Sequence, residues 1–202
     1  LEVLEKEKPT HIAVVFDSKT ATAQRKEIYL DYKANRDETP EDILLSVPYI
    51  KKIIEGFNIP IIEAAGYEAD DVIGTLAKMA EQEGYFTYMM TPDKDFGQLV
   101  SENIVMYKPA RSGNGAEILG VKEICEKFGI EKPEQVIDIL GLWGDSVDNI
   151  PGVPGVGEKT AKKLVAQYGS VEGLYDHTDE IKGKLREKIE ANKEQAFMSK
   201  KL

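Results

Sequence analysis

The stretch Gly66-Tyr67-Glu68-Ala69-Asp70-Asp71 places three carboxylates within four positions, at a point where a loop becomes a helix. An apolar run at 59–62 precedes it and reads as a short buried strand, and the apolar spacing from Val72 onward is helical. A single acid at such a point is usually a helix cap, favoured by the helix dipole. Three neighbouring carboxylates repel one another, and a bound divalent cation is the usual relief. The question for the rest of the chain is whether further carboxylates reach the same place.

The pattern around this stretch predicts an α/β core. Apolar strand-like runs alternate with helical patterns, which is typical of a parallel sheet with right-handed crossovers. The expected strands are 11–17, 59–62, 85–91 and 103–107, and the expected helices are 41–57, 69–83 with Gly84 as its C-cap, and 96–100. A turn-rich loop is expected over 108–115.

Beyond Val121 the pattern is helical only. The expected helices are 121–128, 133–142, 158–168, 171–177 and 180–195, with a Gly/Pro hairpin at 151–157 between them. The sequence therefore predicts an α/β domain over 1–118, which contains a cationic segment at 18–40, followed by an all-helical unit over 119–202.

Acidic residues follow three of the predicted strands, and a fourth acidic pair directly precedes the hairpin. In an open α/β sheet, ligands bind outside the carboxyl ends of the strands, so we expect these acids to converge. The eight candidate metal ligands are Asp17, Glu68, Asp70, Asp71, Asp93, Asp95, Asp145 and Asp148. An all-oxygen ligand set indicates Mg²⁺ or Mn²⁺ rather than zinc, and two such ions about 4 Å apart form the usual clamp for phosphodiester cleavage. The alternative for Asp145 and Asp148 is an ordinary role in a turn and a cap.

Composition narrows the class of protein. The 202 residues carry a formal net charge of −10, yet without the eight candidate ligands only 28 acids face 26 bases, so net charge does not exclude nucleic acid. One cysteine, Cys125, and two histidines argue against a thiol nucleophile and a zinc site. No signal peptide and no apolar run of about 20 residues is visible, so we expect a cytoplasmic protein without a membrane partner.

Two segments are candidates for binding nucleic acid. The hairpin and the helix after it resemble a helix-hairpin-helix element, in which glycines let the backbone approach a phosphate; its candidate residues are Gly155, Gly157, Lys159, Thr160 and Lys162. The segment 18–40 interleaves cations with aromatic groups, and its candidates are Arg25, Lys26, Tyr32, Lys33 and Arg36. The alternatives are a plain connection between helices for the first segment and a solvated charged face, in a mobile loop or surface helix, for the second.

These motifs together closely resemble the five-prime nuclease domains of bacterial DNA polymerase I, in the flap endonuclease family. The resemblance covers nearly the whole chain in the family's order, and is carried by Val15-Phe16-Asp17, Tyr32-Lys33-Ala34-Asn35-Arg36, Gly66 to Asp71, Thr91-Pro92-Asp93-Lys94-Asp95, Gly144 to Val153 and Gly155 to Ala161.

The resemblance implies a PIN-like, resolvase-like nuclease core followed by a helix-hairpin-helix (helix-three-turn-helix) DNA-binding unit. It implies two Mg²⁺ ions among the eight acids, catalytic roles in a helical arch for Arg25 and Lys33, and a K⁺ ion at the hairpin. The implied substrates are DNA with a five-prime flap or a nick and RNA primer–DNA hybrids, cut in replication and repair, and the implied partner is a polymerase domain in the same full-length chain of a bacterial cytoplasm.

One departure from the family leaves an alternative open. The family begins with a further strand that carries an Asp, and this sequence starts after it, which suggests a fragment lacking one metal ligand. A DNA-binding module with impaired catalysis is therefore an alternative to the nuclease. A ribonuclease of the PIN-like architecture is a third hypothesis, disfavoured because such enzymes lack the glycine hairpin.

Overall fold

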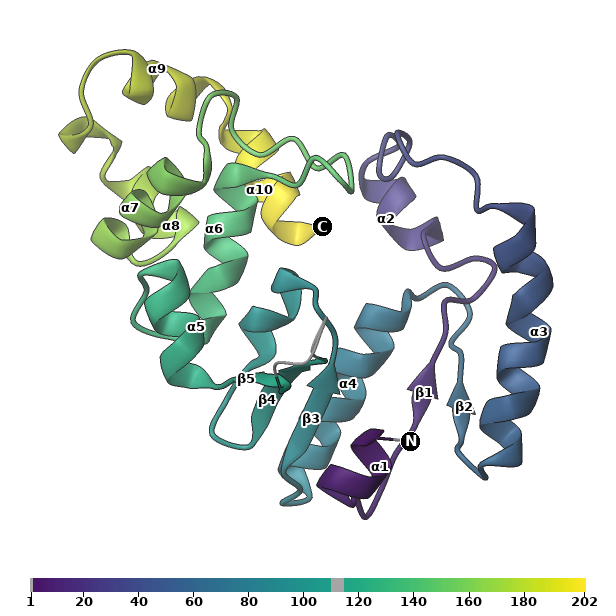
Figure 1. Cartoon of the computed structure of the whole chain (residues 1–202). Helices are drawn as coiled ribbons and strands as arrows, with labels where there is room; N and C mark the ends of the chain where they lie inside the picture. Colours follow the sequence, from purple (N-terminus) through teal and green to yellow (C-terminus); the bar gives the residue numbers. More distant parts are fainter. Residues whose placement is uncertain (1, 110–114) are drawn as a thin grey trace. The chain divides into compact units, whose positions relative to one another are not determined.

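A computed structural model describes residues 2–109 and 115–202 (Figure 1). The chain divides into two compact units. Unit 1 contains residues 1–24 and 37–73, and unit 2 contains 25–36 and 74–202. The chain therefore passes into unit 2 for twelve residues and returns. The predicted boundary between 118 and 119 does not coincide with this division and stays a prediction.

Unit 1 is built around a short pair of parallel strands. Strand β1 (Val14–Val15) pairs with β2 (Ile61–Ile62), in the register Val14↔Ile61 and Val15↔Ile62. The unit also contains α1 (Glu2–Glu7), α3 (Glu41–Gly56) and the beginning of α4 (Ala69–Gln82). Only two residues of each expected strand pair, so β1 and β2 are shorter than their apolar runs.

Unit 2 contains a second sheet, of three strands in the order β3-β4-β5. Strands β3 (Thr87–Met90) and β4 (Ile104–Lys108) are parallel, and β5 (Glu117–Leu119) is antiparallel to β4. Two expectations were wrong here. The described strands form two sheets rather than one, and the second sheet is mixed, because β5 lies in a stretch that the sequence interpretation assigned to no strand. Part of the expected loop 108–115 lies outside the described residues.

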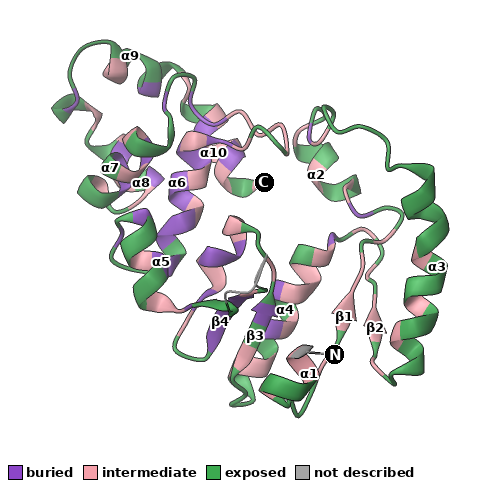
Figure 2. Cartoon of the chain, in the orientation of Figure 1, coloured by how far each residue is buried: buried purple, intermediate pink, exposed green. Residues whose placement is uncertain are grey.

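The core of unit 2 lies between the sheet and the helices that follow it. The 3-10 helix η1 (Lys94–Leu99) lies between β3 and β4. The helices after the sheet are the 3-10 helices η2 (Pro133–Gln135) and η3 (Thr178–Glu180), and α5 (Val121–Phe128), α6 (Val136–Trp143), α7 (Glu158–Tyr168), α8 (Val171–Asp176), α9 (Gly183–Ala191) and α10 (Lys193–Lys201). Helix α6 is central: Val136, Ile139 and Leu142 have no exposed surface (Figure 2). The helix expected over 180–195 is instead η3, α9 and α10, with a break at Asn192.

The segment 18–40 agrees in part with the alternative of a surface helix, because its helix has no buried residue. It contains the short helix α2 (Ala23–Ile28) and a turn at 29–36. Tyr32 is only 3% exposed, although we expected it on a surface where it could stack on a base. That expectation does not hold in this structure, because the Tyr32 ring packs within unit 2. None of the helices in the described ranges has the length and apolar character needed to cross a bilayer.

Candidate metal and nucleic-acid site

The acids of unit 1 lie around the first turn of α4. Asp17, directly after β1 and Phe16, accepts a hydrogen bond at Oδ1 from the Ala69 N–H at 2.7 Å. Asp71 accepts one at Oδ2 from the Glu68 N–H at 3.0 Å. Both bonds satisfy N–H groups that a helix leaves unpaired at its start. Glu68 is buried, at 5% exposure, and Asp70 lies in the first turn. Asp17 and Asp71 therefore do cap the start of helix α4, the role that a single acid usually has at such a point.

Two acids of unit 2, Asp95 and Asp145, meet at Lys94. Asp93 caps η1, because its Oδ1 accepts from the Asp95 N–H at 3.0 Å. Lys94 Nζ donates to Asp145 Oδ2 and lies 3.4 Å from Asp95 Oδ1. Asp95 Oδ1 is buried and accepts no hydrogen bond from the described residues. Sequence reasoning missed Lys94, although its position between Asp93 and Asp95 was a usable signal.

The ionisation of this group follows from burial and mutual repulsion. Burial, and then the charge of Asp93, raise the pKa of Asp95 to about 6. Burial also opposes the charged form of Lys94, but the hydrogen bond to Asp145 and the surrounding carboxylates outweigh it and raise the Lys94 pKa. The pKa of Asp145 is lowered, because hydrogen bonds from Lys94 and from the Val147 N–H outweigh its burial. The site therefore disfavours the charged form of Asp95.

A tight loop joins these acids to the hairpin. Asp145 and Ile150 exchange both backbone hydrogen bonds, at 2.8 and 2.7 Å, and Asp145 Oδ1 accepts from the Val147 N–H at 2.7 Å. The ends of the loop touch: a Cβ added to Gly144 would lie 2.8 Å from the Gly152 nitrogen, closer than real Cβ atoms come to any atom. Residues 144–152 thus form a closed loop that carries Asp145 and Asp148.

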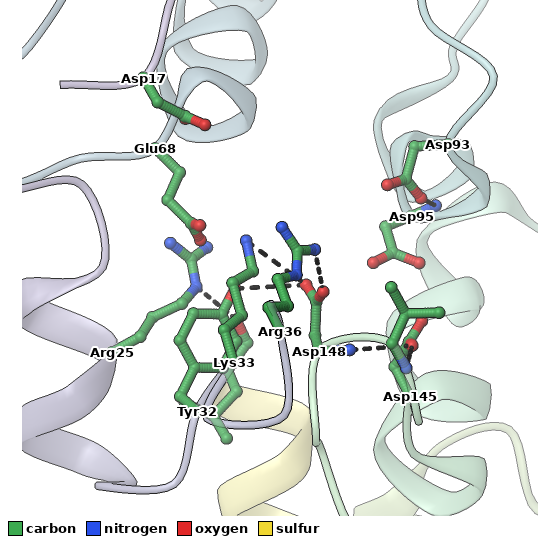
Figure 3. A network of polar contacts seen from close by, with 12 residues as sticks. Asp17, Arg25, Tyr32, Lys33, Arg36, Glu68, Asp93, Asp95, Asp145 and Asp148 are labelled. Carbon is green, nitrogen blue, oxygen red and sulfur yellow. Dashed lines mark hydrogen bonds and ion pairs between the residues drawn. The ribbon is translucent and has the colours of Figure 1, made fainter. Parts of the chain in front are cut away.

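The turn at 29–36 is bound to the same loop. Tyr32 Oη, Lys33 Nζ and Arg36 Nη2 converge on the Asp148 carboxylate, with the first two at 3.4 and 3.6 Å (Figure 3). Backbone bonds reinforce this contact. The Lys33 N–H donates to the Asp148 carbonyl at 2.9 Å, Asn35 Nδ2 donates to the Ser146 carbonyl at 2.7 Å, and Asn149 Nδ2 donates to the Asp31 carbonyl at 2.7 Å.

Sequence reasoning gave three of these residues other roles or none. Lys33 has φ of +55°, in the left-handed region that a lysine rarely adopts. Strain of this kind is held by surrounding contacts and concentrates at functional sites. Asn35 and Asn149 belong to the motifs of the resemblance but were given no role, since an asparagine in a turn carries no specific signal of a distant partner.

The other candidates of the cationic segment are placed differently. Arg25 Nε donates to the Leu202 carbonyl at 2.8 Å, and its guanidinium carbon lies 5.8 Å from the centre of the Tyr32 ring. Lys26 is exposed at the end of α2. Tyr32 therefore serves as a platform for Arg25 and Lys33, whose Nζ lies 5.1 Å from the same ring.

The hairpin candidates divide into exposed and engaged residues. Gly155, Gly157 and Lys159 are exposed, and Thr160 lies in the first turn of α7. Lys162 is engaged: its Nζ lies 2.7 Å from Glu158 Oε1, donates to the Lys127 carbonyl at 2.9 Å, and lies 5.1 Å from the centre of the buried Phe128 ring. Lys162 thus joins α7 to α5, and its role in binding DNA stays a prediction.

The eight acids do not form a ready metal site within one unit. Asp17, Glu68, Asp70 and Asp71 belong to unit 1, and Asp93, Asp95, Asp145 and Asp148 belong to unit 2. Within neither unit, over the described residues, do three His, Cys, Asp or Glu side chains lie close enough together to hold an ion. The donors nevertheless have the chemistry that a hard cation requires, and Asp95 Oδ1 is a buried acceptor without a hydrogen bond.

Two family models match adjacent parts of the chain. The model described as "5'-3' exonuclease, N-terminal resolvase-like domain" matches residues 1–129, and "5'-3' exonuclease, C-terminal SAM fold" matches residues 131–202. Among curated proteins, DNA polymerase I of Bacillus subtilis is 44% identical over 203 residues, which is 100% of this chain and 23% of that protein. The 5'-3' exonuclease of Aquifex aeolicus is 40% identical over 99% of this chain and 66% of its own. The chain thus spans about a quarter of the DNA polymerase I relatives.

Solved structures show the same fold. The T5 5'-exonuclease with bound divalent metal ions (zinc) aligns with a TM-score of 0.81 and 22% identity, over 98% of this chain and 76% of its own. The catalytic core of Rad2 in complex with DNA aligns with a TM-score of 0.59 and 22% identity, over 88% of this chain and 58% of its own. At these identities the likeness concerns the fold alone.

Proposed function

The chain belongs to the 5'-3' exonuclease family, and from this premise we propose that it is a metal-dependent, structure-specific nuclease domain that hydrolyses DNA phosphodiester bonds near five-prime ends. The observation that carries the proposal is the pair of family models that match the chain almost end to end. The gathering of Asp95 and Asp145 about Lys94, with the charge of Asp93 nearby, supports it, since carboxylates are the usual metal ligands for this chemistry.

Divalent cations are the proposed cofactors, with Mg²⁺ preferred and Mn²⁺ an alternative. In unit 2 the proposed ligands are Asp93, Asp95, Asp145 and Asp148, and in unit 1 they are Asp17, Glu68, Asp70 and Asp71. When bound, such ions activate water and stabilise the leaving oxygen of a phosphodiester. Asp95 fits a cation, since a nearby positive charge would offset the cost of burying its carboxylate and the repulsion from Asp93.

The protein's own cations have the other proposed roles. Lys33 and Arg25, held over the Tyr32 ring, are proposed to contact the phosphate at the scissile bond. Lys33 is also paired with Asp148, so binding a phosphate would redistribute its contacts. The hairpin at 151–157 is proposed to bind the duplex backbone, and K⁺ is proposed as an additional ion there.

The proposed substrates are five-prime flaps, nicked duplexes and RNA primer–DNA hybrids, met in replication and repair. The proposed partner is a polymerase domain, because DNA polymerase I relatives align over about a quarter of their length. The proposed location is the bacterial cytoplasm, where such relatives would meet DNA.

The test is cleavage of an end-labelled five-prime flap substrate, with Mg²⁺ and with EDTA. We expect cutting with Mg²⁺ alone, and a loss of about 100-fold or more in Asp93→Asn and Asp145→Asn, since each removes charge from the metal site. Asp176→Asn is the matched control, because Asp176 is exposed on α8. Junction binding in EDTA without cutting under any condition would contradict the nuclease and favour a DNA-binding module.

A further inference from the structure

The hairpin has a buried side and an exposed side. Val153 and Val156 are buried, at 1% and 3% exposure, whereas Pro154 and Gly155 between them are exposed. The Val156 N–H donates to the Val153 carbonyl at 2.9 Å, and the Val153 N–H donates to the Leu142 carbonyl of α6 at 2.8 Å. The two valines anchor the hairpin in the core, so its tip at 154–155 is held at the surface in one position.

Helix α10 fixes the base of the hairpin. Gln195 Nε2 donates to the Gly152 carbonyl at 2.7 Å, and the Gly152 N–H donates to Ser199 Oγ at 3.1 Å. Both polar backbone groups of Gly152 are therefore bonded to α10, and Ser199 is buried. The C-terminal helices thus take part in holding the hairpin.

Helix α9 adds a cation at the tip. A Cβ built on Gly155 would overlap Nζ of Lys188 and lie 3.3 Å from its Cε and 3.5 Å from its Cδ. The Lys188 side chain therefore lies along the glycine where a larger residue would carry its own side chain. Gly155 also has φ of +80°, which disfavours other residues. The ammonium group consequently lies beside the exposed backbone at the tip.

This ammonium has no carboxylate partner within the described ranges 2–109 and 115–202. On α9, Arg186 pairs with Glu190 at 2.8 Å. The helical neighbours of Lys188 at three and four positions are Lys184, Leu185, Ala191 and Asn192, none of which is acidic. No carboxylate in the described ranges therefore neutralises the charge of Lys188, whereas Glu158 neutralises the charge of Lys162.

We propose that Lys188 binds a phosphate of the DNA duplex backbone at the tip of the hairpin, together with the backbone N–H of Gly155. The inference rests on the proposed function, because it assumes that the hairpin binds a duplex. It assigns a DNA contact to α9, which lies outside the hairpin segment, and it makes Lys188 a binding residue that does not touch the reacting bond. A phosphate is the expected ligand, because a lysine ammonium beside exposed backbone can donate charge-assisted hydrogen bonds to negatively charged phosphate oxygens.

The test measures DNA binding by fluorescence anisotropy in EDTA, so that it does not depend on cleavage. Wild type, Lys188→Gln and Lys188→Arg are titrated with labelled duplex, flapped duplex and single strand over a series of KCl concentrations. Lys122→Gln is the matched control, since it makes the same charge change at an exposed residue of α5. Lys184→Gln, one turn before Lys188, tests whether any cation on this face has the same effect.

We expect Lys188→Gln to weaken binding of both duplexes roughly fivefold to tenfold. The slope of log K against log salt should fall by about 0.9, the value for one phosphate contact. Lys188→Arg should restore both quantities, and single-strand binding should not change. An unchanged salt slope, or an equal loss in Lys122→Gln or Lys184→Gln, overturns the inference while leaving the proposed function intact. A lower melting temperature with an unchanged slope identifies Lys188 as purely structural and also overturns it. Failure of wild type to bind any duplex overturns both proposals.

Discussion

Position 155 requires a glycine for two separate reasons, its backbone conformation and the space around it. Its φ is +80° and the place of a Cβ is taken by Lys188, whereas Gly84 has φ of +83° and an added methyl group would meet nothing within 4 Å. We expect Gly84→Ala to cost about 1 kcal/mol in the free energy of unfolding, from backbone conformation alone. Gly155→Ala should cost more and should also weaken duplex binding, because Lys188 must move. Urea unfolding and anisotropy measure the two effects; equal costs in both variants would contradict the crowding at Gly155.

Asp148 shows how one carboxylate can hold a segment. Tyr32, Lys33 and Arg36 all contact it. In Asp148→Asn the charge is lost, while the hydrogen bonds from the Lys33 N–H and from Asn35 Nδ2 to backbone carbonyls of the loop remain possible. We therefore expect the turn at 29–36 to loosen without global unfolding, and trypsin to cut after Lys33 or Arg36 several times faster, since cleavage follows the population of the open form. Asp176→Asn serves as control, and an unchanged cleavage rate would show that the backbone bonds suffice.

At the scale of elements, α10 is joined to α6 and α8 by one lysine. Lys200 Nζ donates to Asp138 Oδ1 and Glu172 Oε2, both at 2.6 Å. Asp138 is buried and also accepts the Val171 N–H at 2.8 Å. A Cβ on Gly141 of α6 would lie 3.0 Å from the Lys200 Cα, so the two helices pack closely there. The C-terminal helix thus depends on an ion pair as well as on apolar contact.

The ion pair between Lys200 and Glu172 makes the free energy of unfolding depend on pH in a definite direction. The hydrogen bond from Lys200 lowers the pKa of Glu172, against a smaller effect of burial. A lowered carboxyl pKa contributes stability that is present above the unfolded value and lost as pH falls through the folded one. Because Glu172 is half exposed, we expect Glu172→Gln to lower the free energy of unfolding by only about 0.5 kcal/mol at pH 7. That difference should vanish between about pH 5 and pH 3 in urea titrations; a gap that persists at pH 3 would exclude the ion pair as its cause.

Elements with local end signals were predictable. The bounds of α5 and α7 match the expected ranges because Gly129 and Gly169 follow them. The break at Asn192 was not predictable, since no Gly or Pro marks it. Strand β5 was not predicted, because three residues are too few to show a periodic pattern. The buried Tyr32 donates a hydrogen bond to Asp148, 116 positions away, and no local pattern predicts that contact. The same reason explains why the acids could be named from the sequence but not their partners.

At the scale of the whole chain, the two units differ in their cores. Among the described residues of unit 1, Ala21 is the one buried apolar side chain, and α3 contains no buried residue while Leu44, Leu45 and Tyr49 are more than half exposed. Unit 2 contains every other buried apolar residue in the described ranges. Figure 2 shows the contrast between α3 and α6. Since burial of apolar groups supplies most of the favourable free energy of folding, unit 1 gains much less stability from burial than unit 2.

We therefore expect amide hydrogen exchange to separate the units. Amides in α3 should exchange through local opening, with protection far below that of α6, whose amides should open only with global unfolding. The length of α3, 16 residues against eight for α6, would on its own favour the opposite order. Peptides covering 41–56 and 136–143 provide the measurement by mass spectrometry. Equal protection of the two helices would show that α3 is stabilised by contacts other than burial of its own residues.

The closed loop at 144–152 has a further consequence. It joins the acids at 145 and 148 to the hairpin through touching ends, and its backbone hydrogen bonds restrict the separation between the two. If the hairpin grips the duplex while Asp145 and Asp148 serve the cut, this loop acts as a molecular ruler. The number of nucleotides between the gripped phosphate and the broken bond would then be a property of the protein's backbone. Lengthening the loop would move the cut along the strand in whole nucleotides, and the length of the product would report the geometry of the fold.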